Sequence, residues 1–494
     1  MSRLFFAALC TCIASVACVF ALPPVPDHSK SCLECRTIVK GLDVVFGNAS
    51  KVESFIEKVN EKCGSHEVCR AIADTIIKIP AGIFEGMDKE AWPDWGLCSL
   101  ISECKAPCCN SLSKPEQVHL SLTENDATKM MVSWVTLEGT ESHVEFGSEP
   151  HSLSQSVVGT VLTYTQGGFV GVIHRAVMTG LEPGKKYYYR VGGDPASNVL
   201  SKWSDTFAFN AIPPAGGKPL TFAVIADMSY DPLSDNTVKY MTKLVDEGKI
   251  DVVVHSGDIS YADGFMPHFD NFMNKIQPIA SRVPYMVAPG NHEFGWNFAA
   301  YKARFFMPGT ADSMFYAWRA GGVAFVALST ETMIDTANMN KDNVEFAEKA
   351  LSNVDRAQTP WVVAHFHRPL YCSSHDSCGK DATHLRKQVE DVFNKHAVDF
   401  TFSGHVHSYQ RTTPVYQEAV KEGAPVYFMQ GAAGNREGKQ GPYPPADQLP
   451  AWIAHSEVEF GVGLFTLSAD QRSIDWQYVD AATGAVLDSA TYKH

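Results

Sequence analysis

The 494-residue sequence lacks an excess of positive charge. It carries 41 Lys and Arg against 55 Asp and Glu, which gives a formal net charge of −14 at pH 7. Proteins that bind a phosphate backbone depend on basic surfaces, so this composition argues against a nucleic-acid partner. The hydrophobic fraction of 45% is that of a globular chain, and the length allows roughly two to four domains with a large core.

Long hydrophobic runs are also lacking beyond the N-terminus. The one extended apolar stretch, Leu4–Phe20, follows Arg3 and ends in small residues just before Pro23 and Pro24. This arrangement predicts a secretory signal peptide over residues 1–21, because the run is short for a membrane span. A membrane anchor is the alternative interpretation. We therefore expect a protein that is secreted or resident in a lysosomal or vacuolar lumen.

The thirteen cysteines fit an oxidising compartment. A second CxxC to match Cys32-x-x-Cys35 is lacking, which favours disulfides over a zinc site. Between Cys32 and Cys104, apolar residues recur at helical spacing, so we expect a small all-α segment of amphipathic helices stapled by disulfides. Asn48 lies in the one N-glycosylation sequon of the chain and is the candidate acceptor.

This cysteine-rich segment resembles a saposin B-type domain, which we assign to residues 28–108. The resemblance implies a lipid- or membrane-contacting module; a structural or prodomain role is the alternative. The inner disulfide spans fewer residues than is usual in that family. The pairing of Cys108 and Cys109, with each other or elsewhere, stays open. The nested pairs that the resemblance implies are Cys32–Cys104, Cys35–Cys98 and Cys63–Cys69.

The remainder of the chain changes character twice. Short alternating strands, such as Met131–Val135 and Tyr187–Val191, predict a fibronectin III-like β-sandwich over residues 113–214. Residues 219–494 then alternate strands with helices, which is typical of an α/β domain, here expected as a β-sandwich flanked by helices. From about residue 424 to residue 494 the pattern returns to β character.

Polar side chains follow five successive strands of the predicted α/β domain, at the point where each strand ends. Each of them has an ordinary interpretation as a turn or cap residue. Because open α/β sheets bind ligands at the carboxyl ends of their strands, five such endings together indicate one site. The residues, in chain order, are Asp227, Asp258 with Tyr261, Asn291 with His292, His365 with His367, and His405 with His407.

The chemistry of this set predicts a two-metal site. Carboxylate, amide, phenolate and imidazole groups together suit a hard trivalent ion beside a borderline divalent ion. A thiol is lacking, which argues against structural zinc, and a phenolate is a known iron ligand. Two ions roughly 3.5–4 Å apart can hold the attacking and leaving oxygens of an in-line displacement at phosphorus.

On these motifs, the chain from about residue 113 resembles a purple acid phosphatase of the binuclear metallophosphoesterase superfamily. The resemblance implies Fe(III) beside a divalent Zn, Mn or Fe ion. It implies that Asp227, Tyr261 and His407 bind iron, that Asp258 bridges, and that Asn291, His367 and His405 bind the divalent metal. Both glycines of the motif around Asp227 are replaced, which puts the geometry of that loop in question. His365 satisfies the bare spacing of the fourth motif, but the His367-Arg368-Pro369 context favours His367.

The resemblance also implies two histidines that act on the substrate. His292 is expected to contact the phosphoryl group. His375 lies between Cys372 and Cys378, which a local disulfide would join. It is the candidate for a leaving-group acid or a phosphate contact, with an exposed loop histidine as the alternative.

The activity implied is hydrolysis of small phosphate monoesters by a metal-activated hydroxide, with an acidic optimum. Two alternatives stay open. One is a sphingomyelinase-like phosphodiesterase with a di-zinc site, against which Tyr261 and the fibronectin-like insert argue. The other is a lipid-binding protein with a vestigial catalytic domain, against which the intact ligand set argues. Nothing in the sequence indicates an oligomeric state.

Overall fold

The computed structural model describes residues 106–107, 109, 114–123, 126–137, 141–193, 203–309, 312–335, 339–374 and 379–494. The predicted signal peptide, the three pairs of the saposin-like segment and Asn48 lie outside these residues, as do His375 and Cys378. Cys109 and Cys372 are each disulfide-bonded. In the described part of the chain, no helix has the length and apolar character needed to cross a bilayer.

The chain divides into two units. In its described part, the first holds two short strands, β1 (Ala106–Pro107) and β7 (Phe169–Val170), which pair in parallel. The second comprises Cys108–Tyr164 and Gly171–His494 and contains both the β-rich domain and the α/β domain that the sequence predicts.

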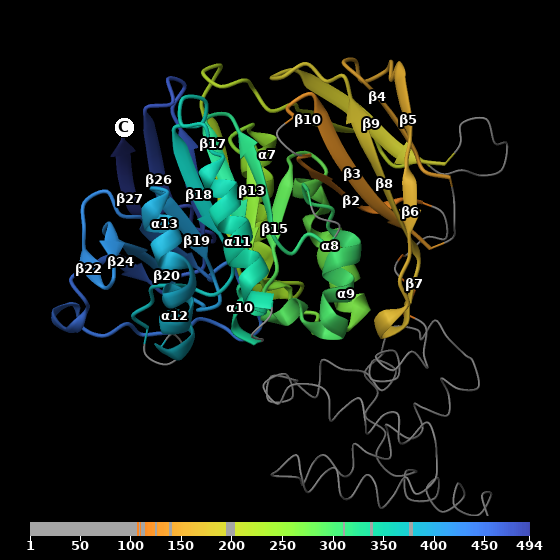
Figure 1. Ribbon diagram of the computed structural model, residues 1–494. Helices are drawn as coiled ribbons and strands as arrows, with labels where there is room; N and C mark the ends of the chain where they lie inside the picture. Colours follow the sequence, from red (N-terminus) through yellow and green to blue (C-terminus); the bar gives the residue numbers. More distant parts are fainter. Residues whose placement is uncertain are drawn as a thin grey trace, which may run out of the picture. The chain divides into compact units, whose positions relative to one another are not determined.

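The β-rich domain is a sandwich of two four-stranded sheets, drawn in orange and yellow in Figure 1. Alternate side chains of its strands are buried, as in β9, where Tyr187, Tyr189 and Val191 point inward. One sheet has the order β2 (Glu116–Ser121), β3 (Lys129–Thr136), β8 (Val172–Thr179), β6 (Thr160–Leu162). The other has the order β10 (Phe207–Asn210), β9 (Lys186–Gly192), β4 (His143–Gly147), β5 (Gln155–Val158).

The α/β domain contains two larger sheets, each with a parallel centre whose strands are almost wholly buried. The six-stranded sheet has the order β15 (Tyr285–Ala288), β13 (Val252–Ser256), β11 (Leu220–Ile225), β25 (Gly461–Leu467), β26 (Ser473–Asp480), β27 (Val486–Lys493). The seven-stranded sheet has the order β16 (Tyr316–Ala320), β17 (Val323–Ala327), β18 (Trp361–His365), β19 (Phe400–Ser403), β23 (Val426–Gln430), β20 (Tyr409–Thr412), β24 (Ile453–Glu457).

Aromatic rings fill the space between these two sheets. Phe222 of β11 lies 5.0 Å from Phe325 of β17, measured between ring centroids. Phe465 of β25 lies 5.3 Å from both Phe400 and Phe402 of β19. Contacts of this kind bury large apolar areas and join the sheets face to face, so the expected β-sandwich is confirmed.

Helices cover the outer faces of the sandwich. Over the seven-stranded sheet lie α11 (Met339–Ser352) and α13 (Asp391–Lys395), which Figure 1 shows across β18 and β19. Their side chains Leu351 and Phe393 join one apolar cluster with Val362 and Ala364 of β18. Two helices connect the parallel strands of the six-stranded sheet. α7 (Asp235–Asp246) lies between β11 and β13 in the chain, and α8 (Met266–Ala280) lies between β13 and β15.

Three elements differ from the sequence-based expectation. α8 was not predicted, although Phe269, Phe272, Met273 and Ile276 recur at helical spacing along it; Pro278 near its end is the one residue that argues against a helix. The sequence predicts a helix over 384–396, whereas the structure begins earlier, with α12 (Gly379–Leu385), and passes through a π turn at Arg386–Glu390 into α13. β18 continues through His365, so this residue belongs to the strand rather than to the loop after it.

A histidine lies at the centre of the smaller sandwich. His174 of β8 is completely buried and stacks on Trp134 with 5.1 Å between ring centroids. Its ring nitrogens lie 2.7 Å from the Thr136 hydroxyl and 2.8 Å from the Ser142 hydroxyl. Burial lowers the pKa of His174 to about 4, so the ring is neutral in the fold at ordinary pH.

His174 therefore makes the fold sensitive to acid. Between pH 6.5 and 4 the unfolded chain binds a proton at this residue and the folded chain does not, so stability falls as the pH falls. We expect His174 to reduce the free energy of unfolding by about 2 kcal/mol between pH 7 and pH 5. Denaturant unfolding of the wild type and of His174→Gln, followed by fluorescence at both pH values, measures this. An equal pH dependence in the two proteins would contradict it.

Candidate metal centre

Short backbone contacts bring together the loops that follow β11 and β13. β12 (Met228–Ser229) pairs in parallel with β14 (Ile259–Ser260) just beyond the ends of the two longer strands. The N–H of Asp227 donates to the Gly257 carbonyl at 3.1 Å, and the N–H of Met228 donates to the Asp258 carbonyl at 3.1 Å. Asp227 and Asp258 are therefore held on adjacent loops at one edge of the sheet, where ligands of α/β proteins bind.

Several of these loop residues have a left-handed backbone. The φ angle is 58° at Asp227, 52° at Asp258, 55° at Tyr261 and 71° at His405. A non-glycine residue in this region costs of order 1 kcal/mol or more, and such residues concentrate at functional sites. The fold therefore accepts local strain in order to aim these four side chains.

Glycines beside the loops leave room for the same side chains. A Cβ atom on Gly290 would lie 2.2 Å from Oδ1 of Asp258, and one on Gly404 would lie 2.1 Å from Oδ2 of Asp227. Gly257, with φ of 87°, would place a Cβ 2.5 Å from Nδ1 of His367. These glycines therefore serve close packing of backbone on polar side chains as well as chain reversal.

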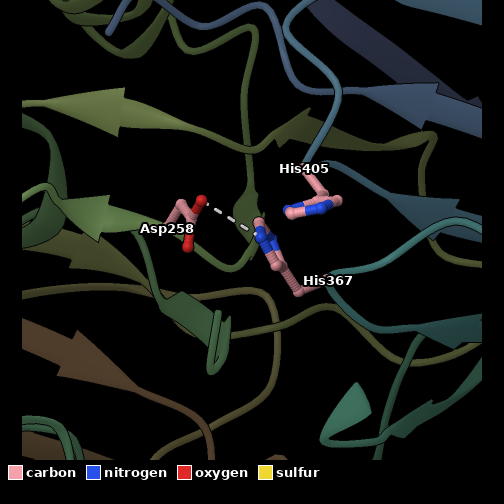
Figure 2. A group of neighbouring side chains, drawn as sticks. All are labelled: Asp258, His367 and His405. Carbon is pink, nitrogen blue, oxygen red and sulfur yellow. Dashed lines mark ion pairs between the residues drawn. The ribbon is translucent and has the colours of Figure 1, made fainter. Parts of the chain in front are cut away.

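The first group of polar atoms surrounds the Nε2 atom of His367 (Figure 2). Oδ2 of Asp258 lies 3.1 Å from this nitrogen, and Oδ1 of Asn291 lies 3.0 Å from it. The other ring nitrogen, Nδ1, lies 3.1 Å from the Ser256 carbonyl, which fixes the orientation of the ring. His405 completes the group, since one ligand atom each of Asp258, His367 and His405 lies within 4.8 Å of the others.

The second group surrounds the hydroxyl of Tyr261. This oxygen lies 3.1 Å from Oδ1 of Asp227 and 3.0 Å from Nε2 of His407, and the latter two atoms are 3.4 Å apart. Asp227 also links this second group to the first group, because its Oδ2 atom accepts a hydrogen bond from the backbone N–H of His405 at 2.8 Å. All seven residues predicted as metal ligands thus fall into these two groups.

His365, the competing residue of the fourth motif, lies elsewhere. It is fully buried inside β18, and its Nε2 accepts a 3.5 Å hydrogen bond from the indole N–H of Trp318. Burial lowers the pKa of His365 to about 3, so the ring is a neutral core group. His367 is beside Asp258 and His365 is packed among the aromatic residues between the sheets.

His292 is held at the edge of both groups by an acidic partner. Its Nδ1 donates to Oδ1 of Asp263 at 2.6 Å, and Asp263 also accepts a hydrogen bond from Arg436. Nε2 of His292 lies 3.8 Å from Oδ2 of Asp258 and 3.4 Å from Oε1 of Glu437. Burial alone would lower the pKa of His292, but the charges of Asp263 and Asp258 raise it to about 10.

Several supporting residues were not predicted. Glu293 accepts the N–H groups of Ile259 and Gly290 at 2.8 Å each and so joins two ligand loops. Arg368 donates to Nε2 of His405 at 2.9 Å and pairs with both carboxylate oxygens of Glu331. The one available signal was proximity in sequence, since Glu293, Asp263 and Arg368 each lie within five residues of a predicted ligand.

The donor atoms fit metal ions. Burial lowers the pKa of His367, but the Asp258 carboxylate raises it to about 9, so a proton is attracted to the point where two oxygens converge on Nε2. A cation at that point would satisfy the same oxygens. Burial and Asp227 raise the pKa of Tyr261 well above its usual range, so a phenolate here requires a neighbouring cation. This set of oxygen and imidazole donors is typical of a binuclear metallophosphoesterase.

Comparison with known families assigns most of the described chain. Residues 115–211 match the model of the purple acid phosphatase N-terminal domain. Residues 220–409 match the calcineurin-like phosphoesterase model, and residues 424–489 match that of the iron/zinc purple acid phosphatase-like protein C-terminal region. These three matches lie within residues 115–489.

Individual relatives agree with these models. The chain is 33% identical to human acid phosphatase type 7 over 354 residues, covering 65% of this chain and 78% of the relative. It is 32% identical to the probable purple acid phosphatase 20 of Arabidopsis thaliana over 394 residues, covering 76% of this chain and 87% of the relative. The solved purple acid phosphatase from yellow lupin seeds matches with a TM-score of 0.68 at 26% identity, covering 77% of this chain and 74% of that one. The chain belongs to the purple acid phosphatase family.

Proposed function

We propose that this protein is a phosphomonoesterase of the purple acid phosphatase type. The observation that supports this most strongly is the arrangement of two adjacent polar groups around His367 and Tyr261, joined through the loops of Asp227 and Asp258. Two ligand sets at the carboxyl ends of parallel strands suit the in-line hydrolysis of a phosphate ester. The acid phosphatases among its relatives support the same activity.

The two groups suggest different ions. The phenol of Tyr261 with Asp227 and His407 suits Fe(III), because a hard trivalent ion favours phenolate and carboxylate oxygens. Asn291, His367 and His405 suit a divalent ion, which we propose is Zn, Mn or Fe. Asp258 is proposed as the shared ligand, since its carboxylate lies beside His367 and its loop also carries Tyr261. Bound ions would lower the pKa of a coordinated water and neutralise charge on the phosphoryl oxygens.

The side chains around the ions would then position the substrate. His292 is proposed to donate a hydrogen bond from Nε2 to the phosphoryl group, because Asp263 fixes the ring through Nδ1. Gly257, Gly290 and Gly404 keep the ligand loops packed closely against the side chains of His367, Asp258 and Asp227. His375 is retained as a proposed contact to the leaving group, on the sequence argument alone.

The proposals for the N-terminal part rest on its sequence. We propose that the protein enters the secretory pathway through a signal peptide and is secreted or retained in a lysosomal or vacuolar lumen. We also propose that the saposin B-like segment, stapled by its nested disulfides, binds lipid surfaces and takes no part in the hydrolysis. A 372–378 disulfide and a glycan on Asn48 are further proposals of the same kind.

The phosphatase activity is expected to depend on His367 and not on His365. His367→Ala should lower the hydrolysis of a small soluble phosphomonoester by more than about 100-fold and release the divalent metal, because it removes a predicted ligand. His365→Ala should retain both metal and most of the activity but unfold at a lower temperature, because it leaves a cavity and an unpaired indole N–H. Metal analysis, activity and thermal unfolding of both variants test this. Greater metal loss in His365→Ala would contradict the assignment.

The lipid proposal has a separate test. A protein lacking the residues before about Asn110 should hydrolyse a soluble phosphomonoester at nearly the normal rate. The same truncation should reduce co-sedimentation with anionic vesicles at acid pH, where the carboxylates of the segment begin to protonate and repulsion from the surface decreases. Equal sedimentation of the full-length and truncated proteins would leave a structural or processing role for the segment.

A further inference from the structure

An aromatic segment directly follows the loop that carries Asn291 and His292. It contains Phe294, Trp296 and Phe298, at the start of α9 (Gly295–Arg304). Phe298 is 3% exposed, whereas Phe294 and Trp296 are each 38% exposed. In the described part of the chain, few large apolar side chains are as exposed as these two. The segment thus buries one ring as an anchor and presents two rings to solvent.

The backbone of this segment is strained. The φ angles of Trp296, Asn297 and Phe298 are 58°, 56° and 61°, so three consecutive non-glycine residues are left-handed. Asparagine tolerates this region, but for tryptophan and phenylalanine it costs roughly 1–2 kcal/mol each. Packing of the core does not require this cost at Trp296, because its side chain is partly in solvent. An unfavourable conformation that exposes an aromatic ring is evidence for a function of that ring.

The segment is fixed against the loop that orients His292. A Cβ atom on Gly295 would lie 2.8 Å from the Cα atom of Gly264, so the two backbones are in close contact. Gly264 follows Asp263, whose carboxylate accepts the Nδ1–H of His292. Trp296 is the fourth residue after His292, so their Cα atoms are at most about 14 Å apart. The segment therefore lies next, along the chain and through the Gly295–Gly264 contact, to the residues that would hold the phosphoryl group.

Phe294 is also held in place. Its ring packs edge to face on Phe298 with 5.4 Å between centroids, and Lys302 lies 5.7 Å above the Phe298 ring. Two carboxylates lie at the ring nitrogens of His292, those of Asp263 and Glu437, and Arg436 pairs with Asp263. Charged groups suit the phosphoryl end of a substrate, whereas two exposed rings beside them suit an organic part that is flat and apolar.

We propose that Phe294 and Trp296 form an aromatic rim that stacks on the leaving group, so that the enzyme prefers phosphate monoesters whose alcohol carries an aromatic ring. This inference rests on the proposed phosphatase function and specifies its substrate class. The rim would contribute to substrate binding, and the chemical step would remain with the metal ligands and His292. Its removal should therefore raise KM for an aromatic ester and leave kcat nearly constant.

The test compares phenyl phosphate with glycerol 2-phosphate. Trp296→Asn removes the ring but keeps a residue that tolerates positive φ, and Phe294→Leu removes the ring but keeps apolar packing on Phe298. Val486→Ala, at an exposed position on β27, is the control. In each rim variant we expect KM for phenyl phosphate to rise roughly three- to tenfold, as expected for the loss of an aromatic pair, and KM for glycerol 2-phosphate to change less than twofold.

The outcomes separate this inference from the function on which it rests. A rise in KM that is equal for the two substrates would show that the rings only support the loop, and would overturn the rim. Unchanged KM for phenyl phosphate in both variants would also overturn it. Hydrolysis of neither ester by the unmodified, metal-loaded protein would overturn the proposed function and the rim with it.

Discussion

Two buried carboxylates impose the constraint on which the site depends. Asp227 and Asp258 have almost no exposed surface, and they lie on loops joined by the short β12–β14 pair. Negative charges buried this closely are unfavourable unless cations or several hydrogen-bond donors neutralise them. The chain itself supplies N–H groups from His405 and His292 and imidazoles from His367 and His407. Metal ions would complete this neutralisation, so their binding would stabilise these loops.

The same constraint explains why the loops have unusual backbones. Asp227 and Asp258 reach the centre because their φ angles are positive, and Gly404 and Gly290 allow the neighbouring chain to pass within contact distance of their oxygens. Both motif glycines around Asp227 are replaced, yet the loop keeps Asp227 beside Tyr261 and His407. In this loop Asp227 takes the left-handed conformation, and Gly431 and Gly404 pack on its carboxylate.

The sequence predicted those features that depend on residues close together in the chain. A buried strand appears in the sequence as a short apolar run, and the polar residue that follows the run lies at the carboxyl edge of the sheet. For this reason the ligands could be predicted before the fold was known. It was uninformative where position depends on contacts between distant segments. Arg436 forms a hydrogen bond with Asp263, which is 173 residues away in the sequence, and no local sequence pattern near either residue predicts this pair. The buried His174 and the core position of His365 likewise follow from packing between strands. The α8 helix is different, because its apolar residues do recur at helical spacing and only Pro278 argues against a helix.

We propose that Asp258 is shared by two metal ions, one of them iron bound to the phenolate of Tyr261. The most direct measurement is metal analysis together with the visible absorption spectrum of the wild type, of Asp258→Asn, and of Asp246→Asn as an exposed control on α7. The account predicts two metal ions per chain and a visible phenolate-to-iron band in the wild type and the control. It predicts that Asp258→Asn, which removes the shared negative charge, loses much of both metals and the band. Two metals and an unchanged spectrum in Asp258→Asn would contradict it.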